Sequence, residues 1–232
     1  MSTGVATRSY VYAVTWSSTP RADDAVDVVE HGELAAVTSP FAGSELRARR
    51  RDLLRHAEIV QRTFDRGTVV PLRFGAVVDD VVSDLLEPRY DELRSLLRSL
   101  DGLVEVTLRA FYREEDVLRA IMRDEPRLAG LRGKAAPVQL GEAVARALAA
   151  RRDRDAASIV GALRPFARGV AVDERRSELE VLRGALLVRR ADLRDVDAAV
   201  DRLAREHATP TLFKYTGPLP PHHFADLDAG GG

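Results

Sequence analysis

The sequence predicts an α+β protein of two similar lobes, each an antiparallel sheet with helices on one face, followed by a proline-rich C-terminal tail. In the second half, alternating and helical hydrophobic patterns follow the order β-α-β-β-α-β, which is typical of a ferredoxin-like sandwich. The first half follows β-β-β-α-β, the same plan without its first helix, and predicts a modified ferredoxin-like lobe. The chain has 232 residues, enough for two small domains.

The first lobe is predicted to span residues 1–100. Runs rich in β-branched and aromatic residues predict its strands at 9–17, 25–30, 33–39 and 68–74. His31-Gly32 joins the second and third runs, and glycine at the second turn position favours a hairpin. Pro71 has no N–H, which predicts that the fourth strand lies at a sheet edge.

Helices complete this lobe. Ser44 is a predicted N-cap, and Gly67 is expected to end the helix that it begins. Helical spacing predicts that this helix buries Leu46, Leu53, Ala57, Val60 and Phe64. Two more helical pieces are predicted at 78–86 and 89–100, on either side of Pro88.

The second lobe is predicted to span residues 101–217. Its predicted strands are 103–112, 169–173, 179–189 and 209–217, and its helices are 114–123, 137–167 and 191–207. Segment 124–136 contains a proline and two glycines and predicts an exposed linker. The long helix loses its apolar stripe near 151–154, where a break is expected.

The predicted tail spans residues 218–232. Three prolines at 218, 220 and 221 forbid a helix and remove ladder donors, so a strand that reaches Tyr215 should end in an extended tail. The segment from Tyr215 to Phe224 costs little entropy to immobilise and carries an aromatic side chain at each end. These properties indicate a docking element more than part of a catalytic cleft.

Composition excludes several classes of protein. With 35 Lys and Arg against 36 Asp and Glu, the net charge is −1, so no overall field favours nucleic acid or an anionic membrane. The absence of cysteine excludes disulfides and thiolate chemistry and fits a cytoplasmic protein. We find no secretory signal pattern and no apolar run long enough to cross a membrane.

Catalytic and cofactor motifs are missing as well. The sequence contains no phosphate loop, no dinucleotide fingerprint and no nucleophile elbow. His222 and His223 are adjacent in an extended tail and point in opposite directions, which disfavours a metal site. We therefore expect no enzyme activity, no cofactor and no metal.

Residues 47–51 form a basic run at the start of the first predicted helix. Acidic residues follow it on the same helix, so a solvent-exposed face or an acidic partner is favoured over nucleic acid.

Two unusual segments, 69–75 and 211–224, resemble the gas vesicle GvpF/GvpL family. That family has a histidine, a helix and a V-L-P-x-R-F-G-T strand, which His56 and residues 70–75 match. It ends in T-G-P-W-P-P-Y-x-F, which residues 216–224 match except at Leu219 and His222. Ala76 also stands where the family often has threonine. The resemblance extends from about residue 9 to residue 224.

The resemblance implies a non-enzymatic accessory protein in the cytoplasm, associated with gas vesicles. Its expected partners are the small hydrophobic shell protein and other accessory proteins, with no nucleic acid and no membrane. His56 is expected to belong to a structural motif. The expected partner-binding residues are Pro71, Arg73, Phe74, Gly75, Tyr215, Gly217, Pro218, Pro220, Pro221 and Phe224.

Two other functions stay open. Paired ferredoxin-like lobes often hold small ligands, so a regulatory module that binds a small molecule is the main alternative. An RNA-binding pair of sandwiches is a third reading, because Phe111, Tyr112, Phe213 and Tyr215 lie on predicted strands. The balanced charge argues against this third reading.

Overall fold

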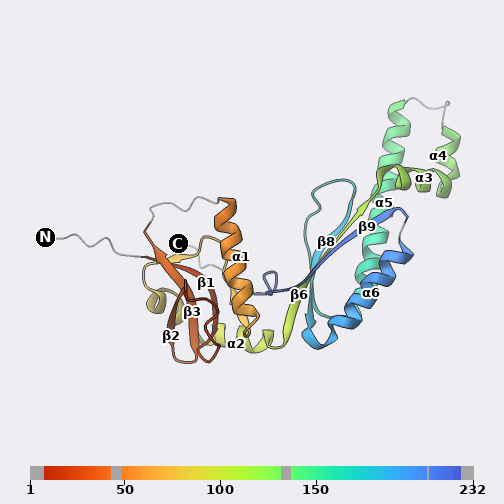
Figure 1. The fold of residues 1–232 in the computed structure, drawn as a ribbon. Coiled ribbons are helices and arrows are strands. Elements are labelled where there is room, and N and C mark those ends of the chain that lie inside the picture. Colours follow the sequence, from red (N-terminus) through yellow and green to blue (C-terminus); the bar gives the residue numbers. More distant parts are fainter. Residues whose placement is uncertain (1–7, 43–48, 132–136, 208, 226–232) are drawn as a thin grey trace. The chain divides into compact units, whose positions relative to one another are not determined.

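The computed structural model describes residues 8–42, 49–131, 137–207 and 209–225. It divides the chain into two compact units (Figure 1). The first unit contains the chain up to Glu105 and again from Pro218 onward, and the second contains Val106–Gly217. The first unit is therefore assembled from two separate stretches of sequence. No helix in the described ranges is long and apolar enough to cross a membrane.

The sheet of the first unit confirms the predicted hairpin and edge strand. Its strands are β1 (Arg8–Trp16), β2 (Asp27–His31), β3 (Leu34–Phe41), β4 (Val69–Pro71) and β5 (Val77–Val78). Their order is β2-β3-β1-β4, with β5 also paired to β1, and these pairs are antiparallel. Gly32 has a φ of 60° in the turn between β2 and β3, a conformation that glycine adopts without strain. The proline-containing β4 lies at the sheet edge.

The helices of this unit are α1 (Arg50–Phe64), the short π-helix η1 (Val82–Leu86) and α2 (Tyr90–Leu100). The predicted cap Ser44 and Leu46 lie outside the described residues. The predicted buried face of α1 was partly wrong, since Leu53 is 43% exposed and Ala57 is exposed. The buried side chains are those of His56, Ile59, Val60, Thr63 and Phe64. A polar side chain, His56, takes a core position because both of its ring nitrogens have partners there. Residues 77–78 form β5, where we had expected a helix to begin at residue 78.

The second unit has the ferredoxin-like order that the sequence predicts. Its elements are β6 (Leu103–Tyr112, beginning in the first unit), α3 (Glu114–Asp124), α4 (Pro126–Leu131), α5 (Pro137–Leu163), η2 (Arg164–Phe166), β7 (Ala167–Val172), β8 (Glu180–Arg189), η3 (Arg190–Asp192), α6 (Leu193–Glu206) and β9 (Thr211–Leu219, ending in the first unit). The sheet order is β7-β8-β6-β9. Both sheets thus place their second, third, first and fourth strands side by side. In Figure 1, α5 and α6 lie along one face of the second sheet.

Three details of this unit differ from the prediction. The expected linker contains α4. Helix α5 continues through 151–154, where Arg151 donates to Asp124 over 2.7 Å and pairs with Asp155 one turn away. Strand β9 runs through Pro218 to Leu219 instead of ending at Gly217. Because β9 lies at a sheet edge, a residue without an N–H is tolerated in it.

The core of the first unit positions the candidate site. Every residue from Tyr10 to Thr15 on β1 is buried, so both faces of this central strand are covered. A core cluster combines Tyr10 and Tyr12 with Val26, Val37, Ile59 and Val60, and Phe41 and Phe74 pack against it. Helix α1 thereby places its buried face over the aromatic residues of β1.

Candidate functional site

Tyr10, His56 and Gly75 form a hydrogen-bond network between β1, α1 and the segment after β4, buried at Tyr10 and His56 and part-buried at Gly75. The Tyr10 hydroxyl lies 2.8 Å from His56 Nδ1, and His56 Nε2 lies 3.1 Å from the Leu72 carbonyl oxygen. A carbonyl only accepts, so Nε2 carries the hydrogen and Nδ1 accepts from the tyrosine. The Gly75 N–H completes the network by donating to the Tyr10 hydroxyl over 3.2 Å.

Burial keeps both side chains of this network neutral. Desolvation lowers the pKa of His56, although the hydrogen bond to Leu72 acts in the opposite direction. Burial raises the pKa of Tyr10 to about 12, against the hydrogen bond from Gly75. Near neutral pH the imidazole and the phenol are both uncharged, as the hydrogen-bond pattern requires. The network therefore has the properties of a structural link.

Aromatic packing explains two more residues of the motif. The rings of Tyr10 and Tyr12 are 4.8 Å apart, and the Phe74 ring lies 6.0 Å from Tyr10 and 5.7 Å from His56. These separations are typical of favourable aromatic pairs. Gly75 has a φ of 103°, which an L side chain rarely adopts. The sequence around β4 thus fixes a turn that returns to β1.

A matched pair of variants tests this network. We expect Tyr10→Phe to lower the free energy of unfolding by about 2 kcal/mol, since His56 Nδ1 and the Gly75 N–H both lose their partner. Tyr12→Phe removes only the 3.1 Å hydrogen bond to the part-buried Ser39 and should cost about 0.5 kcal/mol. Urea denaturation of both variants measures the difference, and equal losses would contradict the structural role of the Tyr10 hydroxyl.

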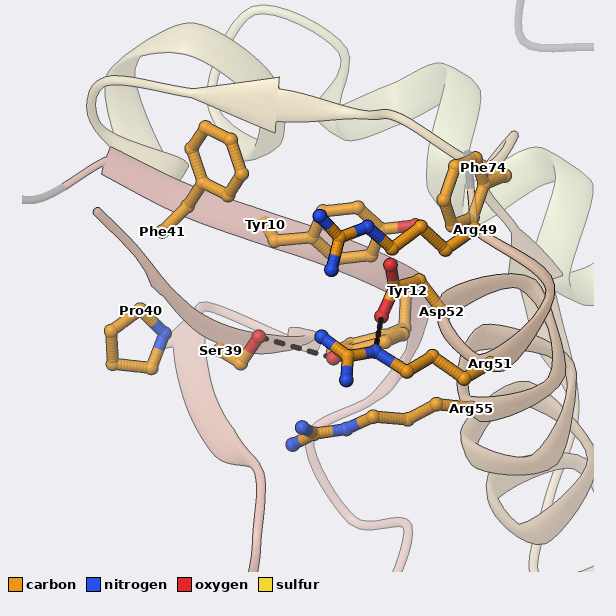
Figure 2. A pocket seen from close by; sticks show the side chains of 10 residues that line it. All are labelled: Tyr10, Tyr12, Ser39, Pro40, Phe41, Arg49, Arg51, Asp52, Arg55 and Phe74. Atoms are coloured by element: carbon orange, nitrogen blue, oxygen red, sulfur yellow. Dashed lines mark hydrogen bonds and ion pairs between the residues drawn. The ribbon is translucent and has the colours of Figure 1, made fainter. Parts of the chain in front are cut away.

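An open pocket of about 340 Å³ lies beside this network (Figure 2). Aromatic rings from β1, β3 and the segment after β4 line it on one side, and side chains from the start of α1 line it on the other. The lining residues are Tyr10, Tyr12, Ser39, Pro40, Phe41, Arg49, Arg51, Asp52, Arg55 and Phe74. Of these, only Phe74 was among the predicted partner-binding residues, and Arg49 and Arg51 belong to the basic run 47–51. The alternation of β1 could have indicated that Tyr10 and Tyr12 share one face.

The C-terminal segment is anchored on a buried carboxylate. Glu105 is 1% exposed, and it accepts hydrogen bonds from the backbone N–H of His223 at 2.8 Å and from its imidazole Nδ1 at 2.7 Å. Pro220, Pro221 and Ala225 are buried as well. The sequence predicts a strand at 103–112 but indicates no partner for Glu105 within it. Of the two adjacent histidines, His223 binds this carboxylate, and both residues are exposed.

The remaining predicted site residues are distributed over both units. Pro71 is buried at the end of β4, Arg73 is exposed and Phe224 is partly buried. Tyr215 and Gly217 belong to β9 in the second unit, where the Tyr215 hydroxyl donates to Asp197 over 2.8 Å. Pro218 also belongs to β9 and is exposed. The structure brings Phe74 and Gly75 together with His56, and their part in partner binding remains a prediction.

The fold and this site define a class of protein, an α+β chain with two ferredoxin-like sheets and an arginine-rimmed aromatic pocket. Within the residues that the structure describes, no group of three His, Asp or Glu side chains could hold a metal ion.

The comparisons with known proteins identify the family. The model of the family "Gas vesicle synthesis protein GvpL/GvpF" matches residues 8–226, and the chain belongs to this family. Gas vesicle protein F of Streptomyces sp. (strain CB03234) is 33% identical over 239 residues, covering 94% of this chain and 99% of the relative. Gas vesicle protein F of Dolichospermum flosaquae is 27% identical over 195 residues, covering 78% of this chain and 80% of the relative.

Solved structures show the same fold. The crystal structure of GvpF from Anabaena sp. PCC7120 superposes with a TM-score of 0.83 at 23% identity, covering 95% of this chain and 99% of that chain. GvpF from Microcystis aeruginosa gives a TM-score of 0.77 at 19% identity, covering 95% and 100%. The predicted family and the two-sheet α+β fold are confirmed, and the protein takes part in gas vesicle formation.

Proposed function

We propose that this protein is a non-enzymatic assembly factor that binds the gas vesicle shell protein or another accessory protein of the vesicle. The observation that carries the proposal is the family match over residues 8–226. The geometry of the motif supports it, because the polar atoms of Tyr10 and His56 serve hydrogen bonds within the unit. Such a motif fixes the conformation of the surface around it, which is what recognition of a partner protein requires.

A polymerising shell subunit needs a partner that covers its exposed surfaces before assembly. A small hydrophobic subunit that assembles into a β-rich wall exposes apolar surface and strand edges before it is incorporated. A protein that covers these surfaces in the cytoplasm keeps the subunit available for assembly. The exposed residues near the end of β9, and the exposed Arg73 that follows the buried edge strand β4, are the candidate surfaces for this contact.

A gene deletion in a vesicle-forming host tests the proposal. We expect the deletion strain to lack normal, gas-filled vesicles, and expression of the intact chain to restore them. Electron microscopy and pressure-sensitive light scattering measure vesicle number and collapse. Normal vesicles in the deletion strain would contradict a role in assembly.

Arg73 offers a more local test, because it is exposed and follows β4 directly. We expect Arg73→Ala to weaken capture of the shell protein, through loss of a direct contact or through a loss of stability in the first unit. Pull-down with a parallel thermal melt separates the two effects. Arg98→Ala, at an exposed position on α2, is the matched control. Unchanged capture would remove Arg73 from the partner-binding surface.

A further inference from the structure

The floor of the pocket beside Tyr10 is aromatic, and its polar atoms already have partners. The Tyr10 hydroxyl is shared between His56 and Gly75, and the Tyr12 hydroxyl bonds to Ser39 Oγ over 3.1 Å. Figure 2 shows the rings of Tyr10, Tyr12 and Phe41 facing the open space. A ligand therefore contacts ring surface on the floor of the pocket, because the hydroxyl groups of the floor already form hydrogen bonds within the protein. Such a floor favours an apolar group.

The rim of the same pocket is positively charged. Arg49, Arg51 and Arg55 extend from the start of α1 over the space, as Figure 2 shows, and all three are exposed. Asp52 is the one carboxylate in the described lining, so three positive charges against one negative leave a net charge of +2. Asp52 lies 3.3 Å from Arg51 Nε, with the two side chains 41% and 77% exposed. An ion pair this exposed holds the guanidinium only weakly.

We infer that this pocket binds an acidic peptide segment of a partner protein, with one apolar side chain on the aromatic floor and neighbouring carboxylates on the arginines. Charge complementarity selects the carboxylates, because guanidinium groups form paired hydrogen bonds with them. A volume of about 340 Å³ accommodates one large side chain and part of its backbone. The inference rests on the proposed function and gives it a contact surface.

Three short peptides separate the apolar and the acidic requirement. Each has acetyl and amide ends and two glycines on either side of Asp-Leu-Asp, Asn-Leu-Asn or Asp-Gly-Asp. Titration into the ¹⁵N-labelled full chain, followed by NMR, should give saturable shifts at the backbone amides of residues 39, 41, 74 and 75 with the first peptide. We expect each of the other two to bind roughly tenfold more weakly. Equal binding of Asp-Leu-Asp and Asn-Leu-Asn, or no shift at these amides at millimolar peptide, would overturn the inference.

Matched arginine variants locate the contact. The variant with Arg49→Gln, Arg51→Gln and Arg55→Gln should bind Asp-Leu-Asp roughly tenfold more weakly than the natural chain. The control changes Arg194, Arg202 and Arg205 on α6 to glutamine, which removes the same charge from exposed positions in the other unit. Its affinity should stay unchanged. If both variants lose affinity equally, overall charge explains the binding and the pocket assignment fails.

Two further measurements identify the occupant. A chain ending at Ala225 lacks the acidic residues Asp226 and Asp228 and should bind the peptide as the full chain does. Binding by the shortened chain alone would make the chain's own segment the occupant and overturn the partner assignment. Capture of the shell protein or accessory proteins of the same gene cluster should be lost in the triple arginine variant. Equal capture by the triple variant would overturn the pocket inference alone, whereas failure of the natural chain to capture any of them would contradict the proposed function.

Discussion

Replacement of Glu105 by alanine is expected to lower the free energy of unfolding by about 3 kcal/mol and to release the C-terminal segment from the first unit. The carboxylate is 1% exposed and holds His223 through both a backbone and a side-chain hydrogen bond. Without it, the His223 N–H loses its partner, and the prolines that follow β9 lose the contact that positions them. Urea denaturation measures the loss of stability.

Proteolysis reports release of the segment directly. Phe224 is partly buried in the intact protein, and chymotrypsin should cleave after it faster in the Glu105→Ala variant than in the natural chain. His223→Ala keeps the backbone hydrogen bond and should lose only about 1 kcal/mol. Glu92→Ala, which removes an exposed partner of Arg89, is the control and should change stability by less than about 0.5 kcal/mol. If Glu105→Ala behaved like Glu92→Ala, the anchor would have no energetic role.

The second large effect is expected for His56→Leu. Leucine nearly preserves the volume, but the Tyr10 hydroxyl loses its acceptor and the Leu72 carbonyl its donor inside the core. The lost hydrogen bonds of a buried hydroxyl donor and a part-buried carbonyl should cost about 3 kcal/mol together, measurable by urea denaturation. Ala57→Leu, at the exposed neighbouring position of α1, should change stability by less than about 0.5 kcal/mol. A loss below about 1 kcal/mol for His56→Leu would contradict the network.

The pH dependence of stability gives an independent check on His56. Burial lowers its pKa in the folded protein below the value of 6.5 that applies in the unfolded chain. Below that pH the unfolded chain binds more protons than the folded one at this site, so the free energy of unfolding falls as pH drops from 6.5 toward the folded pKa. Above pH 6.5 the contribution is fully present. The His56→Leu variant should lack this part of the acid dependence.

Local patterns predicted most of the fold. Strand β6 has the bounds that its alternating pattern predicts. Gly32 specifies a turn because it adopts a positive φ, and Pro71 specifies an edge strand because it has no N–H to donate. These features depend on neighbouring residues alone. The common strand order of the two sheets followed from the succession of elements, with a loop in place of the first helix.

The candidate site was less predictable because its contacts are distant in sequence. Glu105 and His223 are 118 residues apart, and nothing near Glu105 indicates that a proline-rich segment will cover it. The burial of His56 likewise depends on Tyr10, 46 residues earlier. Helical spacing alone favoured Leu53 as a core residue, whereas satisfied hydrogen bonds placed the histidine in the core. The sequence motifs indicated which segments form the site, but only the structure showed which residues these segments contact.

The discontinuity of the first unit has a consequence for biosynthesis. A nascent chain has made all of β1 to α2 long before His223 emerges from the ribosome, so Glu105 lacks its hydrogen bonds to His223 until the chain has grown by another 118 residues. The whole inserted unit, Val106–Gly217, has to be made before the C-terminal segment that completes the first unit. A polypeptide that terminates before this segment would lack the buried residues Pro220, Pro221 and Ala225 and would leave Glu105 without its hydrogen bonds to His223, so its first unit would be incomplete.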